Sequence, residues 1–292
     1  MFKAPEGFIF WGSDYNALES RVGAIITGDE ALRKILLDGY DSHSLYTAVY
    51  FEDELRERGL PHGPNITVEE SFIIKEKADD KRSESKACTF SLQYSGTEHT
   101  VSKSLGCSLE RAKAIVEAYH KLHGGVTAYY NKKTEEALKN GYYMIETGLK
   151  LRAPGLDSTD EAMVEKTKRS ATNALIQGFG MLTVKAINKL QAIIEEEGMQ
   201  ERVIIINTIH DAIYGYVRED VEVIKWLNEK LIMVMTEDFY EGQDIKLLAE
   251  LDIGPSWKYQ YTLENNASVE SIEEVLQSAY EEYENDKKPI AA

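Results

Sequence analysis

Two apolar runs in the last third of the chain constrain its fold most strongly. Val203 to Ile206 and Ala212 to Val217 flank a short polar stretch that contains His210 and Asp211. β-Branched and aromatic runs around a short polar link are typical of a β-hairpin, because strands favour such side chains and the turn exposes its backbone to water. The sequence therefore predicts a hairpin with a carboxylate at its turn.

A second carboxylate follows an apolar run near the N-terminus. Residues 8–11 are Phe, Ile, Phe and Trp, and Asp14 comes shortly after them, which predicts a buried strand that ends in an acid. If this strand and the hairpin share one sheet, Asp14 and Asp211 meet at its rim. Two such carboxylates are what a pair of Mg²⁺ ions about 4 Å apart requires, with Mn²⁺ as the alternative ion.

A third feature is a stripe of charged and aromatic residues in the middle of the chain. Arg82, Lys86, Phe90 and Tyr94 recur every four residues. On an α-helix four residues advance about 40° beyond a full turn, so these side chains share one face. Cations at one end and rings at the other suit a nucleotide, with its phosphates and flat base. A solvated helix with a fortuitous stripe is the alternative.

With these residues in order, the chain resembles family A DNA polymerases, the family of bacterial DNA polymerase I and many phage replicative enzymes. The resemblance extends from about Phe2 to Trp257. The segments similar to motifs A, B and C are Asp14 to Arg21, Arg82 to Gly96 and Ile209 to Asp211. Further similar stretches are Ala4 to Gly7, Asp41 to Ser44 with Thr47 and Ala48, and the series Arg169, Asn173, Gln177 and Gly178.

The resemblance implies an α+β fold in which an antiparallel palm sheet carries a large α-helical fingers insertion. We expect palm at residues 1–27, fingers at 28–160 and palm again at 161–263. Residues 264–292 lie beyond this body and contain eight acidic residues and two lysines, a net charge of −6. We expect them to form an acidic helical extension.

The resemblance also implies an activity, template-directed transfer of dNTPs to the 3′-hydroxyl of a primer. Asp14 and Asp211 would hold both metal ions, assisted by the backbone carbonyl of Tyr15. The implied nucleotide contacts are Glu19, His43, Arg82, Lys86, Phe90 and Tyr94. The implied primer-template contacts are Arg169, Asn173, Gln177 and His210.

Several of these roles have a chemical reason. Glu19 would fill the space of a ribose 2′-hydroxyl and so favour deoxynucleotides, and Phe90 in place of Tyr would disfavour dideoxynucleotides. Arg169, Asn173 and Gln177 are again four residues apart, and such polar side chains suit the minor groove, whose hydrogen-bond acceptors depend little on sequence. A solvent-facing polar stripe is the alternative for these three residues.

The chain departs from the family pattern at three places. Ala212 stands where motif C usually has Glu, so any accessory metal or water contact from that carboxylate is lost. Ser95 separates Tyr94 from the following glycine, and Asn16-Ala17 replaces a more usual polar pair. We expect these changes to affect fidelity and nucleotide preference more than the class of reaction.

The charge balance is unusual for a protein that binds a polyanion. Thirty-three basic and fifty acidic residues give a net charge of −17, whereas DNA binding gains free energy from cations that release phosphate counterions. Met1 lies thirteen residues before Asp14, which leaves no upstream room for a thumb or exonuclease domain. We therefore expect a second polypeptide to carry the thumb, the exonuclease or both. An expression fragment or degraded product is the alternative.

The acidic extension has a narrow apolar seam. Ile272, Leu276, Ala279 and Tyr283 follow one another at steps of four, three and four, as on a helix that lies against another surface. The seam either packs back on the palm, stays disordered, or docks a processivity or replisome partner.

Two other classes of protein stay open. A single-subunit RNA polymerase shares the two aspartates and the Arg-Lys-Tyr helix and often has a small residue where Ala212 stands, but Glu19 argues against it. A catalytically silent accessory subunit of polymerase fold is the second alternative, and the joint presence of Asp14, Asp211, Arg82 and Lys86 argues against it.

Cysteine content and hydropathy indicate the compartment. Cys88 and Cys107 are too few for a disulfide framework. No apolar run approaches about twenty residues, so we expect no membrane association and a cytoplasmic location, in a bacterial host if the protein is phage-encoded.

Overall fold

The computed structural model describes residues 3–93 and 96–286, without the side chains of residues 90, 93, 172, 173 and 175–177. The chain divides into two compact units. The sheet unit comprises Met1–Leu18, Phe179–Glu241 and Lys246–Ala292. The helical unit comprises Glu19–Gly178 and Gly242–Ile245. Along the chain, the boundaries between these units follow residues 18, 178, 241 and 245.

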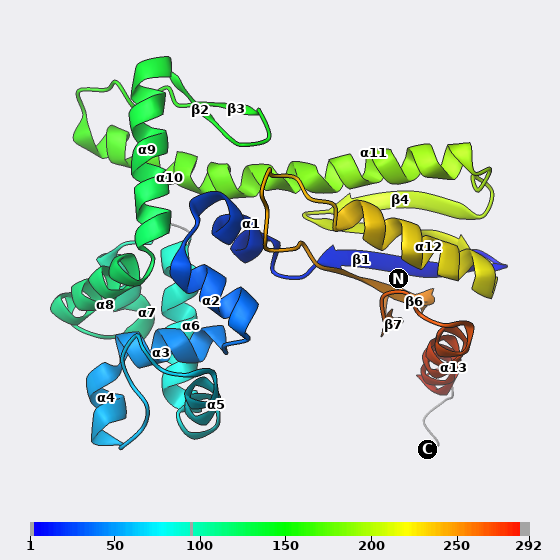
Figure 1. Cartoon of the computed structure of the whole chain (residues 1–292), viewed down its shortest axis with the longest axis horizontal. Coiled ribbons are helices and arrows are strands. Elements are labelled where there is room, and N and C mark those ends of the chain that lie inside the picture. The colour runs from blue at the N-terminus through cyan, green and yellow to red at the C-terminus, as the bar shows by residue number, and fades with distance from the viewer. Residues whose placement is uncertain (1–2, 94–95, 287–292) are drawn as a thin grey trace. The chain divides into compact units, whose positions relative to one another are not determined.

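The sheet unit is built on a five-stranded antiparallel sheet in the order β4-β5-β1-β6-β7 (Figure 1). Its strands are β1 (Phe8–Tyr15), β4 (Val203–Ile209), β5 (Ala212–Arg218), β6 (Ala249–Ser256) and β7 (Tyr259–Leu263). Its helices are α11 (Met181–Glu196), α12 (Val221–Met235) and α13 (Val269–Asp286), and a 3₁₀ turn, Gly178–Gly180, leads into α11. The predicted hairpin and the predicted N-terminal strand therefore exist and share one sheet.

The two faces of β1 have different partners. Trp11 and Ser13 point to the helical side, where the Ser13 hydroxyl lies 3.1 Å from the sulfur of Met235 on α12. Trp11 pairs with Gly215 of β5, and a Cβ atom at Gly215 would lie 2.3 Å from the Trp11 ring, so only glycine fits there. Because side chains alternate along a strand, Asp14 belongs to the opposite face. We call this the Asp14 face of the sheet.

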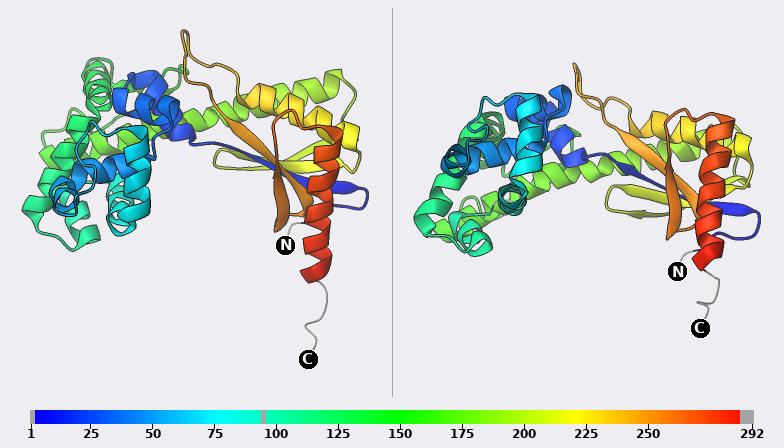
Figure 2. Two further views of the ribbon diagram at one scale, coloured as in Figure 1. Left: turned by 60° about the horizontal axis from the view of Figure 1, so that its bottom comes forward. Right: turned by 90° about the horizontal axis from the view of Figure 1, so that it is seen from below.

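The C-terminal helix α13 packs beside β6 and β7 (Figure 2). Ile272 and Ala279 are fully buried, and the Tyr283 ring contacts Tyr259 of β7 edge-on at 5.3 Å between centroids. The predicted helix is therefore present, and its apolar seam lies against the strands of the same chain. This is the packing-back alternative for residues 269–286, with Leu276 and Tyr283 partly exposed.

The helical unit contains ten helices that the described residues define and one small hairpin. The first five helices are α1 (Leu18–Thr27), α2 (Glu30–Asp38), α3 (Ser42–Tyr50), α4 (Glu52–Glu57) and α5 (Val68–Lys77). The others are α6 (Asp79–Gln93), α7 (Glu98–Leu105), α8 (Leu109–Leu122), α9 (Gly124–Asn140) and α10 (Glu161–Gln177). The hairpin consists of β2 (Tyr142–Met144) and β3 (Lys150–Arg152). The antiparallel sheet and the large helical insertion confirm the predicted α+β class.

None of the helices that the structure describes combines the length and the apolar character that a membrane crossing demands.

A buried acid-base pair joins distant helices of this unit. The Asp29 carboxylate caps α2 by accepting the Leu32 amide at 3.0 Å, and it also accepts the Gly125 amide at 3.1 Å at the start of α9. Its Oδ1 lies 2.9 Å from Nδ1 of His123, and both side chains are almost completely buried. Burial favours a higher pKa for Asp29, but the hydrogen bond and charge of His123, with the backbone amides, outweigh it and lower the pKa.

This pair predicts a specific dependence of stability on pH. A carboxyl whose pKa is lower in the folded chain stabilises the fold above its unfolded pKa of about 3.9, and this contribution disappears as the pH falls through the folded value. We expect Asp29→Asn to lower the unfolding free energy near neutral pH by about 2 kcal/mol, because the carboxylate that accepts the Leu32 and Gly125 amides is replaced by an amide, which leaves buried groups without a partner. Urea unfolding at several pH values measures both effects.

The matched control is Asp38→Asn, which changes an exposed acid near the other end of α2. It should leave both the stability and its acid dependence unchanged. Equal behaviour of the two variants would show that Asp29 does not hold this junction together.

Candidate active site

Asp14 lies near the end of β1, where the central strand leaves the sheet. It pairs with Glu250 of β6 in the register of the sheet, and its side chain is exposed. Its Oδ1 accepts the backbone N–H of Tyr15 at 2.8 Å. The following turn places Ala17 in the left-handed region at φ 54°. Strand pairing and this turn together present the carboxylate at the rim of the Asp14 face.

Asp211 lies in the two-residue turn between β4 and β5. Ile209 and Ala212 form the last strand pair, so His210 and Asp211 make up the loop. His210 has a φ of 56°, a left-handed conformation that costs energy for a residue other than glycine. The backbone carbonyl of Asp211 accepts the Thr183 hydroxyl of α11 at 3.3 Å. The hairpin predicted from sequence therefore carries its acid at the tip, as expected.

The two aspartates are close enough to influence each other. The pKa of Asp14 is raised, first by partial desolvation at the sheet and then by the negative charge of Asp211, with a smaller effect of Asp252. Burial and the charge of Asp211 also raise the pKa of Tyr15. Unpaired carboxylates that repel one another are stabilised by a cation, and hard oxygen donors suit Mg²⁺. Asp14 and Asp211 therefore fit the predicted divalent metal ions.

Among residues 3–93 and 96–286, no group of three or more His, Cys, Asp or Glu side chains is arranged to hold a metal ion. Mg²⁺ keeps several waters and is commonly bound by one or two carboxylates together with substrate phosphates. A pair of aspartates without a third protein ligand is compatible with that mode.

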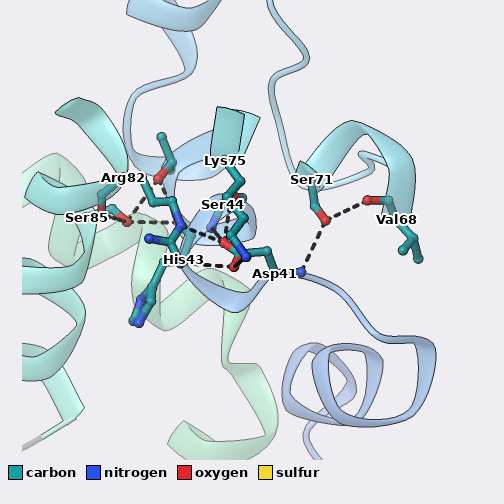
Figure 3. Close-up of polar contacts among 9 residues, drawn as sticks. Asp41, His43, Ser44, Val68, Ser71, Lys75, Arg82 and Ser85 are labelled. Atoms are coloured by element: carbon teal, nitrogen blue, oxygen red, sulfur yellow. Dashed lines mark hydrogen bonds and ion pairs between the residues drawn. The ribbon is translucent and has the colours of Figure 1, made fainter. Parts of the chain in front are cut away.

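Arg82, Lys86 and Phe90 of the stripe predicted for motif B lie on α6 in the helical unit. The buried side of α6 consists of Ser85, Cys88, Thr89 and Leu92, which pack inward. Lys86 is exposed on another side of the helix, and Arg82 is partly exposed. Arg82 makes two hydrogen bonds to the carboxylate of Asp41, from Nε to Oδ1 at 2.8 Å and from Nη2 to Oδ2 at 3.0 Å (Figure 3).

His43 on α3 belongs to the same group. The Ser85 hydroxyl donates to the His43 carbonyl at 2.9 Å, which ties α6 to α3. Burial and the positive charges of Arg82 and Lys86 lower the pKa of His43, and the charge of Asp41 opposes this only partly. The structure thus brings His43, Arg82 and Lys86 together and favours a neutral imidazole, which can still donate one hydrogen bond to a phosphate.

The remaining predicted residues are placed to different degrees. Glu19 is exposed on α1. Burial raises the pKa of the Tyr130 phenol on α9, and the nearby Tyr119 and Glu19 side chains add smaller contributions in the same direction. Arg169 is exposed on α10. Asn173 and Gln177 also lie on α10, and Phe90 lies on α6. The side chains of these three residues are outside the described part of the structure. Tyr94 lies outside the described residues altogether.

The predicted residues fall into the two units. The sheet unit contains Asp14, Tyr15, His210 and Asp211. The helical unit contains Glu19, His43, Arg82, Lys86, Phe90, Arg169, Asn173 and Gln177.

Two acids near these groups were given no role from the sequence. Asp252 pairs with Gly12 across β6 and β1, and its Oδ1 accepts the Thr262 hydroxyl at 2.7 Å. Asp41 caps α3 by accepting the Ser44 amide at 3.0 Å. An Asp three residues before a Ser at a helix start is a recognisable capping signal, but no local pattern indicates which arginine that Asp meets.

The left-handed backbone at His210 predicts how the turn responds to substitution. We expect His210→Val to lower the unfolding free energy by roughly 1–2 kcal/mol, because a β-branched side chain clashes in this conformation. His210→Asn is the matched control, since Asn tolerates positive φ, and it should be close to neutral. Urea unfolding compares the two variants. Equal stability of both would contradict the assigned turn geometry.

Comparison with known proteins identifies the family to which this chain is similar. The family model of DNA polymerase family A matches residues 65–259. DNA polymerase I of Pseudomonas aeruginosa is 26% identical over 257 residues, which are 88% of this chain and 25% of that protein. Thermostable DNA polymerase I of Thermus aquaticus is 27% identical over 259 residues, 88% of this chain and 28% of that protein.

A phage protein and a solved structure are also similar. The DNA polymerase of Mycobacterium phage D29 is 32% identical over 150 residues, 51% of this chain and 21% of that protein. The POL domain of Pol1 from M. smegmatis, solved in complex with DNA primer-template and dNTP, is 25% identical with a TM-score of 0.71. That match covers 87% of this chain and 41% of the other.

The chain therefore spans about a quarter of the length of these curated relatives. The family match nevertheless covers most of the chain itself and includes the helix of Arg82 and the turn of Asp211. The chain belongs to DNA polymerase family A.

Proposed function

We propose that this chain carries the catalytic aspartates and the triphosphate-binding helix of a template-directed DNA polymerase, which adds dNTPs to a primer 3′-hydroxyl. The observation that carries the proposal is the placement of Asp14 and Asp211. They come from distant parts of the chain, lie near each other at one sheet, and repel each other electrostatically. Membership of family A and the similar structure bound to primer-template and dNTP support it.

The aspartates would hold two Mg²⁺ ions, with Mn²⁺ as the alternative and the Tyr15 carbonyl as a further ligand. Bound there, such ions lower the pKa of an attacking hydroxyl and stabilise the charge on a leaving pyrophosphate. The chain's own task is to hold the carboxylates in place. The strand pairs of β1 and the two-residue turn of the hairpin do this before any substrate arrives.

Arg82, Lys86 and His43 would bind the triphosphate of the incoming nucleotide. Negative charge on the phosphoryl oxygens favours fixed cations and hydrogen-bond donors around it. The stacking roles predicted for Phe90 and Tyr94 complete this proposal, because a base at the ring end of the stripe would leave its phosphates beside Arg82 and Lys86.

The remaining roles concern the sugar and the duplex. Glu19 is proposed to exclude a ribose 2′-hydroxyl, which distinguishes this chain from an RNA polymerase. Arg169, Asn173 and Gln177 on α10 are proposed to contact the minor groove of the primer-template. His210, exposed beside Asp211, is proposed to contact the primer terminus.

Neutralising either catalytic aspartate tests the reaction. We expect Asp14→Asn and Asp211→Asn each to reduce primer extension roughly a thousandfold, because several kcal/mol of charge stabilisation depend on the ions that these side chains hold. Glu201→Gln is the matched control, since this exposed acid lies at the far end of the same hairpin, and it should keep full activity.

Two outcomes would contradict the proposal. Extension that persists in Asp211→Asn would mean that another protein in the preparation is the polymerase and would favour a silent accessory subunit. A clear preference of the wild-type chain for NTPs over dNTPs would favour an RNA polymerase.

We further infer, from charge, that a second polypeptide helps to hold DNA. A net charge of −17 opposes binding to a polyanion, and this partner would carry a thumb, an exonuclease or both. We expect the chain alone to extend primers in short, distributive steps, and the product of the neighbouring upstream gene to lengthen them. Primer extension with an excess of unlabelled trap DNA measures the product length made in a single binding event. Equal product lengths with and without that protein would refute the inference.

A further inference from the structure

Two cations from different helices converge on one carboxylate in the helical unit. Arg82 of α6 donates to Asp41 Oδ2 from Nη2 at 3.0 Å, and Nζ of Lys75 on α5 lies 3.7 Å from the same oxygen. Figure 3 shows the side chains of Lys75 and Arg82 both directed toward the Asp41 carboxylate. Lys75 belongs to none of the motifs that relate the chain to its family.

The carboxylate between them is firmly held. The Asp41 Oδ1 accepts two hydrogen bonds from Ser44, one from its backbone amide at 3.0 Å and one from its side-chain hydroxyl at 2.7 Å. The backbone N–H of Asp41 donates to the Ser71 hydroxyl of α5 at 3.2 Å, so the same residue ties α3 to α5. Burial favours a higher pKa for Asp41, but the hydrogen bonds of Arg82 and Ser44 outweigh it and hold the pKa at about 2. Asp41 is therefore ionised throughout the physiological range.

Each cation keeps the capacity to bind a second anion. Asp41 pairs with the Nε and Nη2 side of Arg82, and a guanidinium has five N–H donors in all. An ammonium has three donors, and Lys75 is half exposed and 3.7 Å from its acid. Asp41 and its two cations carry a net charge of +1 as a group, and the negative charge of Asp79 also acts on Arg82. The group is therefore suited to a further, external anion that bears several oxygens.

We propose that Lys75 is a third phosphate-binding cation for the incoming nucleoside triphosphate, held beside Arg82 by their shared contact with Asp41. This inference rests on the proposed function, in which Arg82 and Lys86 bind the same triphosphate. Asp41 is a positioning residue, because it fixes the spacing of Lys75 and Arg82 without contacting the substrate itself.

The test is the affinity of the full chain for dATP and for dAMP, each measured by titration calorimetry with Mg²⁺. We expect Lys75→Met to weaken dATP binding roughly fivefold to tenfold, the size of one partly solvated charged hydrogen bond. The affinity for dAMP should change much less, because the lost contact is to the outer phosphates. Lys75→Arg should restore dATP binding, since it retains the cation.

Lys77→Met is the matched control, because Lys77 is exposed one half-turn further along α5. An affinity loss in Lys77→Met equal to that in Lys75→Met would reduce the effect to general charge and overturn the proposal. A dAMP affinity that falls as much as that of dATP would also overturn it, as would wild-type dATP affinity in Lys75→Met. Thermal unfolding of each variant identifies any loss of affinity that comes from misfolding. If Lys75→Met is misfolded, the same titrations are made with Lys75→Gln.

Arg82→Met separates this inference from the proposed function. If Arg82→Met loses dATP affinity while Lys75→Met does not, Lys75 is no phosphate ligand and the triphosphate site on α6 stands. If neither variant changes the dATP affinity, the triphosphate site itself is wrong.

Discussion

The antiparallel pairing of β1 with β5 on one side and β6 on the other is the interaction on which the candidate site depends. It brings an N-terminal strand between two C-terminal ones. Trp11 over Gly215 fixes the register on the helical side. A slip by one residue would turn Asp14 toward the helices, because strand side chains alternate. The position of Asp14 is therefore decided by apolar packing on the opposite face.

The helical unit positions its cations differently, through polar contacts at helix ends. Asp41 caps α3 and also binds Arg82, so the start of one helix sets the side chain of another. Ser85 is small enough to let α3 and α6 approach and hydrogen-bond through the His43 carbonyl. Charged groups held in this way lose little side-chain freedom when a ligand binds, which favours a preorganised anion site.

Much of the fold could be predicted because it follows from local patterns. The hairpin around Asp211, the strand before Asp14 and the seam of α13 all follow from the period of apolar residues. The pairing of Lys75 and Asp252 with their neighbours could not be predicted. Lys75 looks like any exposed helical lysine, and Asp252 like any acid in a strand, until α5 and β6 are packed against their partners.

The sequence by itself determined which segments form strands and helices and which side chains have the chemistry of a polymerase site, because period and residue type are local properties. Only the tertiary structure decided which acid meets which cation and which face of the sheet receives Asp14. It also decided that α13 covers the chain's own β6 and β7. Such pairings depend on burying surfaces from distant segments together, and no single stretch of sequence contains that information.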